Sequence, residues 1–210
     1  QEGDNSEKVS ICCTSLTDGK EVWKRSFSSS SPIERSKMVS QAAPSPVVDS
    51  KGLDVFFESG DLLALNHEGT ELWRKNLGKE YGPLTGHHGL GSSLFQSDTC
   101  LGLLLDHPDP SYLLCFDKLS GKAVWSVKRE KRVSWATPTL VGDSLFISSN
   151  GLLEEFDFTT GKQLWFVGDL TGNTVASATV SGDLVIVGSS AKGNCIAVRR
   201  GGSGDVTETH

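Results

Sequence analysis

The chain lacks any long apolar run, and no stretch approaches the roughly 18 residues that a membrane-spanning helix requires. It also lacks an excess of positive charge. Its 20 Lys and Arg residues stand against 26 Asp and Glu residues, which gives a formal net charge of −6. This balance argues against a general nucleic-acid binder. The one basic run, at 128–132, is interrupted by Glu130 and is interpreted as a solvated loop.

Several further signals are missing. The five cysteines have no zinc-ligand spacing and are odd in number, so they leave the redox compartment open. The first residues are polar and show no signal peptide. No segment has sustained helical periodicity, apart from a short turn expected at 31–37. No hydrolase-type Ser/His/Asp motif and no phosphate-cradling glycine loop ahead of a helix is found.

A glycine followed four residues later by a tryptophan is the most regular feature that is present. It recurs at intervals of roughly 40–50 residues, a period typical of repeat folds. We expect the glycine to adopt a positive φ in a tight turn. We expect the tryptophan ring to cover the interface with a neighbouring repeat, as a core residue. The pairs are Gly19 and Trp23, Gly69 and Trp73, Gly121 and Trp125, and Gly161 and Trp165.

Three of the copies share the same preceding order: a small-residue stretch, a β-rich run, and an alternating strand that leads into the glycine turn. Each unit therefore predicts four short antiparallel strands. Such units in series predict an all-β fold, a β-propeller of four-stranded blades. The prediction is a single domain over 1–210, with a partial blade at 7–27, blades at about 41–77, 91–129 and 135–169, and a partial blade at 175–199.

Two copies carry a longer motif, "FDKLSGKAVW" at 116–125 and "FDFTTGKQLW" at 156–165. This motif resembles the tryptophan-docking repeat of the PQQ-like (quinoprotein-type) β-propellers. That repeat runs small residue, x, Asp, x, x, Thr, Gly, Lys, x, x, Trp. The other copies depart from it, with Ser15 and Asn66 at the Asp position. The resemblance covers nearly the whole chain. It implies the fold and leaves the activity open, because the family includes dehydrogenases, outer-membrane assembly scaffolds and uncharacterised exported proteins.

The two ends of the chain predict incomplete blades. The first has only its last two strands, and the last has its first three, followed by a fifth glycine-rich turn at 201–205. Either the ends join in one composite blade of a four-bladed ring, or the chain is an excerpt of a larger propeller. A composite blade would hold five strands. The excerpt is therefore favoured, with pairing to a missing remainder, and the resemblance to the quinoproteins implies a ring of eight blades.

The candidate site residues lie in loops that enter the innermost strands, where propellers usually place function. They are His87, His88, Trp135 and Asn173. Paired histidines can hold a metal or polarise a hydroxyl group. However, neighbours in an extended chain point opposite ways, so polar loop contacts are favoured over a small ligand or a metal. Trp135 either stacks on a planar ligand or plugs the channel, and the plug is favoured.

The resemblance also raises a cofactor question. Some quinoprotein alcohol dehydrogenases have a disulfide between adjacent cysteines against the cofactor, and Cys12 and Cys13 superficially match that pair. They lie on a third strand, away from the channel mouth, so two small, buried, reduced thiols are expected instead. Calcium needs several converging oxygens, and only "DHPDP" at 106–110 offers a weak alternative for it. No catalytic residue or metal ligand is predicted.

The leading functional hypothesis is a non-catalytic PQQ-like β-propeller that acts as a binding or scaffold domain for a protein or carbohydrate partner. One alternative is a fragment of a PQQ- and calcium-dependent alcohol or sugar dehydrogenase. Another is the extracytoplasmic sensor domain of a larger protein. The resemblance implies a periplasmic or secreted location.

Overall fold

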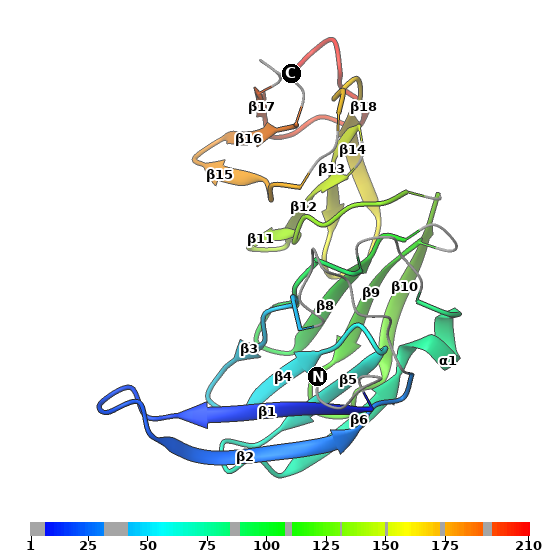
Figure 1. Ribbon diagram of the computed structural model, residues 1–210. Helices are drawn as coiled ribbons and strands as arrows, with labels where there is room; N and C mark the ends of the chain where they lie inside the picture. The colour runs from blue at the N-terminus through cyan, green and yellow to red at the C-terminus, as the bar shows by residue number, and fades with distance from the viewer. Residues whose placement is uncertain are drawn as a thin grey trace. The chain divides into compact units, whose positions relative to one another are not determined.

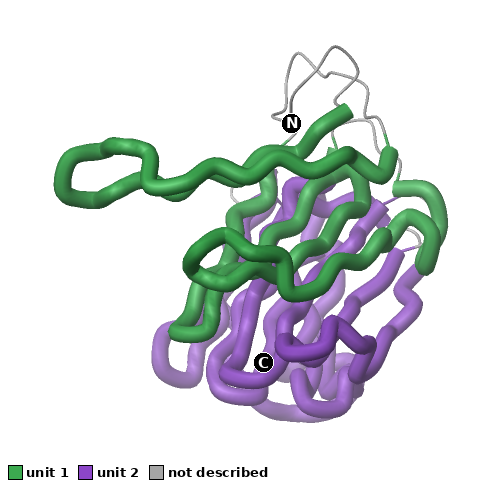
Figure 2. The backbone as a smooth tube through the Cα atoms, turned by 90° about the horizontal axis from the view of Figure 1, so that it is seen from below, with its two compact units in different colours: residues 1–89 green, residues 90–210 purple. Residues whose placement is uncertain are grey.

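The computed structural model describes eight stretches of the chain, and nearly all their regular structure is β-strand. The chain divides into two compact units, residues 1–89 and 90–210, which Figure 2 shows in green and purple. The turn expected at 31–37 falls almost wholly outside the described residues. Those residues are 7–31, 42–84, 89–107, 111–130, 132–149, 151–172, 175–190 and 195–210.

The first unit contains two antiparallel sheets and one short helix (Figure 1). The helix, α1 (Leu77–Tyr81), was not predicted, because five residues are too few to show a helical period. It begins after Asn76, whose side chain accepts a hydrogen bond from the Lys79 backbone N–H at 3.0 Å. Sheet A consists of β1 (Lys8–Thr14) and β2 (Glu21–Ser28), and sheet B of β3 (Val47–Val48), β4 (Leu53–Phe56), β5 (Asp61–Leu65) and β6 (Glu71–Asn76).

The second unit contains three sheets. Sheet C consists of β7 (Phe95–Gln96), β8 (Cys100–Leu105), β9 (Ser111–Asp117) and β10 (Ala123–Arg129). Sheet D consists of β11 (Thr139–Val141), β12 (Ser144–Ser149), β13 (Leu152–Asp157), β14 (Gln163–Val167) and β18 (Gly204–Asp205). Sheet E consists of β15 (Thr179–Ser181), β16 (Leu184–Gly188) and β17 (Cys195–Arg199).

Sheets B and C and the first four strands of sheet D each follow chain order, with every neighbouring pair antiparallel. Apolar side chains gather between successive sheets of each unit, since alternate residues of a strand point to opposite faces. One cluster joins sheets A and B, a second joins C and D, and a third joins D and E. The prediction of an all-β fold with four-stranded propeller blades is confirmed.

The glycine–tryptophan pairs connect neighbouring sheets. Gly161 has a φ of 73°, in the left-handed region that favours glycine. A Cβ added there would lie 2.8 Å from the ring of Trp125, which belongs to the preceding sheet. The Trp125 Nε1–H also donates to the Phe158 carbonyl at 3.0 Å. Trp23 does the same toward sheet B, where it donates to the His67 carbonyl at 2.8 Å.

The glycine-rich turn at 201–205 also contributes a strand to sheet D. Its last two residues form β18, which pairs in parallel with β14 at the outer edge of sheet D. Val206, which follows, is 3% exposed and belongs to the cluster between sheets D and E. The sequence did not indicate this pairing, because two residues carry no detectable strand period.

Candidate functional site

The predicted channel-mouth residues are only partly described. His87, His88 and Asn173 lie outside the described residues. Trp135 lies in the loop before β11 and is half-buried. It packs on Gly91, where an added Cβ would lie 2.9 Å from Trp135 Cδ1. The plug and the ligand-stacking roles of Trp135 both stay predictions.

The adjacent cysteines are both free thiols, and Cys12 is exposed while Cys13 is half-buried. The expectation of two buried thiols was therefore wrong for Cys12. The reason is the alternation of the strand, because Val9 and Ile11 face the cluster between sheets A and B, so Cys12 points to the opposite side. It lies opposite Lys24 on β2, which is also exposed.

Sheets C and D are joined by a buried ionic network. The Arg129 side chain, 3% exposed, donates from Nε to Asp106 Oδ1 at 3.1 Å and from Nη2 to Glu154 Oε2 at 2.7 Å. Arg132 Nη1 donates to the same Glu154 oxygen at 2.9 Å. Burial alone would lower the pKa of Arg129, but the two carboxylates outweigh it and raise that pKa.

The network bears on the calcium alternative at 106–110. Residues 108–110 lie outside the described residues. Asp106 is already bound to Arg129 and accepts a hydrogen bond from Ser149 Oγ at 2.5 Å. Within the described stretches, no group of three or more His, Cys, Asp or Glu side chains could hold a metal ion. Asp106 is therefore already engaged by Arg129 and Ser149, and calcium binding at 106–110 stays an alternative.

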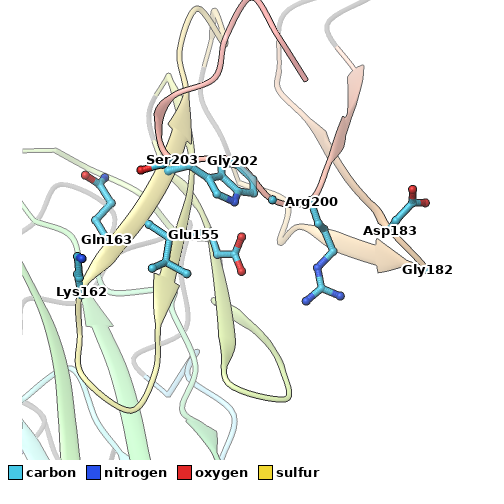
Figure 3. A pocket seen from close by; sticks show the side chains of 11 residues that line it. Glu155, Lys162, Gln163, Gly182, Asp183, Arg200, Gly202 and Ser203 are labelled. Carbon is cyan, nitrogen blue, oxygen red and sulfur yellow. The ribbon is translucent and has the colours of Figure 1, made fainter.

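A cavity of about 600 Å³ lies beside β14, between sheet D and the residues that flank sheet E (Figure 3). Its walls include Glu155 and Trp165, which are buried, and Arg200, which is half-buried. The glycine-rich turn at 201–205 contributes its first three residues to the same wall. The sequence reasoning missed this cavity, although "EE" at 154–155 was a visible departure from the small residues of the repeat.

No helix within the described residues is long enough and apolar enough to cross a bilayer.

A family model described as outer membrane protein assembly factor BamB matches residues 58–208, more than half of the chain. No curated protein matches the chain.

Three solved structures illustrate the likeness. BamB from Moraxella catarrhalis is 20% identical, with a TM-score of 0.66, over 93% of this chain and 56% of its own. A europium-containing methanol dehydrogenase is 10% identical, with a TM-score of 0.61, over 85% of this chain and 43% of its own. A quinohemoprotein alcohol dehydrogenase from Pseudomonas putida HK5 is 14% identical, with a TM-score of 0.52, over 68% of this chain and 27% of its own. At these identities the likeness shows the fold alone. The chain covers 56% of the BamB structure and therefore spans about half of its length.

Proposed function

The chain belongs to the PQQ-like repeat family that the BamB description represents, and from this premise we propose that it is a non-catalytic β-propeller scaffold that binds a protein partner. The partner adds an extended segment to the outer edge of a sheet. As an assembly-type scaffold it works outside the cytoplasm, in the periplasm or after secretion.

The observation that carries this proposal is the pairing of β18 with β14. Within the described residues, β14 is the outermost of the four antiparallel strands of its sheet, and a short segment from elsewhere in the chain has added to its edge. An exposed strand edge is a template for such additions, in which backbone hydrogen bonds supply affinity. A backbone segment favours a protein partner over a carbohydrate.

The outermost strands of sheets B and C offer the same geometry. In the described part of the chain, β6 and β10 end their sheets with no further strand beyond them. Each presents an exposed apolar residue just before its tryptophan, Leu72 on β6 and Val124 on β10, which are 56% and 52% exposed. An apolar side chain beside an open edge suits the alternate side chains of an added strand.

The first experiment distinguishes the scaffold hypothesis from the dehydrogenase hypothesis. The protein is titrated with pyrroloquinoline quinone and Ca²⁺ while absorbance and thermal stability are followed. We expect no saturable binding and no dye reduction with alcohols or aldoses. Saturable binding with a raised melting temperature, followed by substrate oxidation, would show that the protein is a PQQ-dependent dehydrogenase and not a non-catalytic scaffold.

A second experiment tests the edge itself. A photo-crosslinking residue placed at Val124 in living cells captures the partner, which is then purified and titrated by calorimetry. We expect Val124→Glu to weaken the measured affinity at least tenfold. Val141→Glu, at an exposed position on β11 at the opposite edge of sheet D from β18, should leave it unchanged. Equal affinities for both variants would place the partner elsewhere.

A further inference from the structure

Strand β13 carries two consecutive acidic residues whose surroundings differ. Side chains alternate along a strand, so Glu154 and Glu155 face opposite sides of sheet D. Glu154 faces sheet C and is satisfied by Arg129 and Arg132, at 2.7 and 2.9 Å. Glu155 is 5% exposed, yet no hydrogen bond or ion pair joins its carboxylate to another described residue. Its side chain forms part of the wall of the cavity beside β14, and Figure 3 shows the carboxylate directed into that space.

Glu155 is also exceptional within the repeat. In every copy, the residue directly opposite the tryptophan on the preceding strand is defined by the strand register. In three copies this residue is small: Cys13, Ala64 and Cys115. In the fourth copy it is Glu155, opposite Trp165. The fold therefore does not require an acid at this position, and a different role must explain it.

Trp165 departs from its counterparts as well. It is 1% exposed, and its Nε1–H has no hydrogen-bond acceptor among the described residues. Trp23 and Trp125 each donate to a backbone carbonyl of the next sheet. Since Glu155 and Trp165 are cross-strand neighbours, a carboxylate and a buried N–H, neither bound to another described residue, come from adjacent strands at one wall of the cavity.

A positive group faces the same cavity. Arg200 Nη2 donates to Ser144 Oγ at 3.2 Å, and the guanidinium lies 5.2 Å from the ring centre of Phe146. Within the described stretches it forms no ion pair with a carboxylate. Asp183, also on the wall, is paired with Arg199. Figure 3 shows the Glu155 carboxylate directed toward the space beside the Arg200 guanidinium.

We propose that this cavity binds a zwitterionic ligand of the α-amino acid class. The ligand ammonium donates hydrogen bonds to Glu155. The ligand carboxylate accepts from the Arg200 guanidinium and from Trp165 Nε1–H, and hydrogen bonds between charged groups are stronger than neutral ones. The volume of about 600 Å³ is within the range of roughly 300–1,000 Å³ found for small-molecule sites. This site is independent of the strand-edge partner proposed above.

The test begins with the ligand. Each of the twenty L-amino acids is tested singly by thermal shift and then by calorimetry. We expect at least one to bind saturably and to raise the melting temperature. Its carboxamide and its N-acetyl derivative, which each lack one charge, should bind at least tenfold more weakly. If none of the twenty binds, or if the derivatives bind equally well, the proposal is overturned.

Variants then test the residues. Glu155→Gln keeps the side-chain shape and should weaken binding at least tenfold with little change in the melting temperature of the free protein. Trp165→Phe, which removes only the N–H donor and part of the ring, should weaken binding severalfold. Glu68→Gln, at an exposed turn of sheet B, is the matched control and should change neither quantity. A lower melting temperature of the free Glu155→Gln protein with unchanged ligand affinity would mean that Glu155 pairs with Arg200 or Lys162 as a structural ion pair.

Discussion

At the scale of the single residue, the glycines of the repeat turns meet two separate demands. The first is a positive φ, which Gly161 shares with several other turn glycines. The second is close contact, because the Trp125 ring occupies the place where a side chain at position 161 would begin. Gly142, in the turn between β11 and β12, has a φ of 61° but nothing within 4 Å of an added Cβ. The two positions therefore separate conformational strain from crowding.

Replacing Gly161 with alanine should destabilise the protein by about 2–4 kcal/mol, as the sum of left-handed strain and overpacking against an aromatic ring. Gly142→Ala should cost only the strain, about 1–2 kcal/mol. Urea denaturation of both variants measures the difference. Equal losses would show that the Trp125 ring moves aside freely.

Asp157 organises the turn that holds Gly161. Its Oδ1 accepts from Thr159 N at 2.8 Å, from Thr159 Oγ1 at 2.6 Å and from Thr160 N at 3.0 Å. Asn66 occupies the same position in sheet B, and its Oδ1 also accepts from two backbone N–H groups. We expect Asp157→Ala to cost about 1–2 kcal/mol of stability and Asp157→Asn to cost less. Chemical denaturation at pH 7 should give this order, and an equal loss for both would contradict it.

The same turn predicts a pH dependence. The hydrogen bond from the Thr159 hydroxyl, followed by the backbone N–H bonds, lowers the pKa of Asp157 below 3.8. A lowered pKa in the folded state means that the stabilisation is fully present above the unfolded value and is lost as the pH falls through the folded value. Unfolding measured at pH 7 and at pH 3 should therefore show a smaller difference between the native protein and Asp157→Asn at pH 3. A gap that stays constant would contradict the shift.

At the scale of the element, sheets C and D are held together by apolar packing and by the Arg129 network. A buried ion pair adds little net stability, but removing one partner leaves the others unpaired. Asp106 and Glu154 both depend on Arg129, and only Glu154 has a second cation, Arg132. The network therefore adds an ionic contact between β10 and β13 on the face of β10 that already packs against sheet D through Trp125 and Val127.

Arg129→Met should destabilise the second unit by about 3–5 kcal/mol, because it leaves the Asp106 carboxylate buried without a cation. Lys128→Met, the neighbouring and exposed position on β10, serves as the control and should change stability by less than about 0.5 kcal/mol. Thermal and urea unfolding measure both. A loss for Arg129→Met that is no larger than the control's would show that Asp106 is protonated or hydrated instead.

At the scale of the whole molecule, three hydrophobic clusters each lie within one of the two compact units. The cluster of sheets A and B lies within residues 1–89, and the clusters of sheets C and D and of sheets D and E lie within 90–210. In a repeat fold, stability is approximately a sum of repeats and of the interfaces between neighbours. The second unit therefore has more of both.

Residues 90–210 expressed alone should fold and unfold in a cooperative urea transition, because two interfaces between sheets lie entirely inside the fragment. Residues 1–89, with one such interface, should show a lower transition midpoint. Far-ultraviolet circular dichroism against urea measures both. A broad, non-cooperative transition for residues 90–210 would show that its stability depends on the first unit.

What the sequence by itself determined is local and periodic. Alternating apolar residues, turn glycines and the spacing of the tryptophans act within a few residues of one another, so they predicted the strands, their antiparallel order and the propeller class. The five-residue helix α1 and the two-residue strand β18 were too short to leave such a period. The exposure of Cys12 was missed because it depends on which face of sheet A is covered.

Only the tertiary structure decided which distant side chains meet. Arg129 reaches Asp106 and Glu154 across two sheets, and their spacing along the chain contains no trace of that contact. Glu155 was readable as a departure from the small residues of the repeat, but its lack of a partner was not. Whether a charged side chain is paired depends on the residues that pack around it. Glu155 lies on the wall of a cavity, next to a Trp165 N–H that has no acceptor among the described residues.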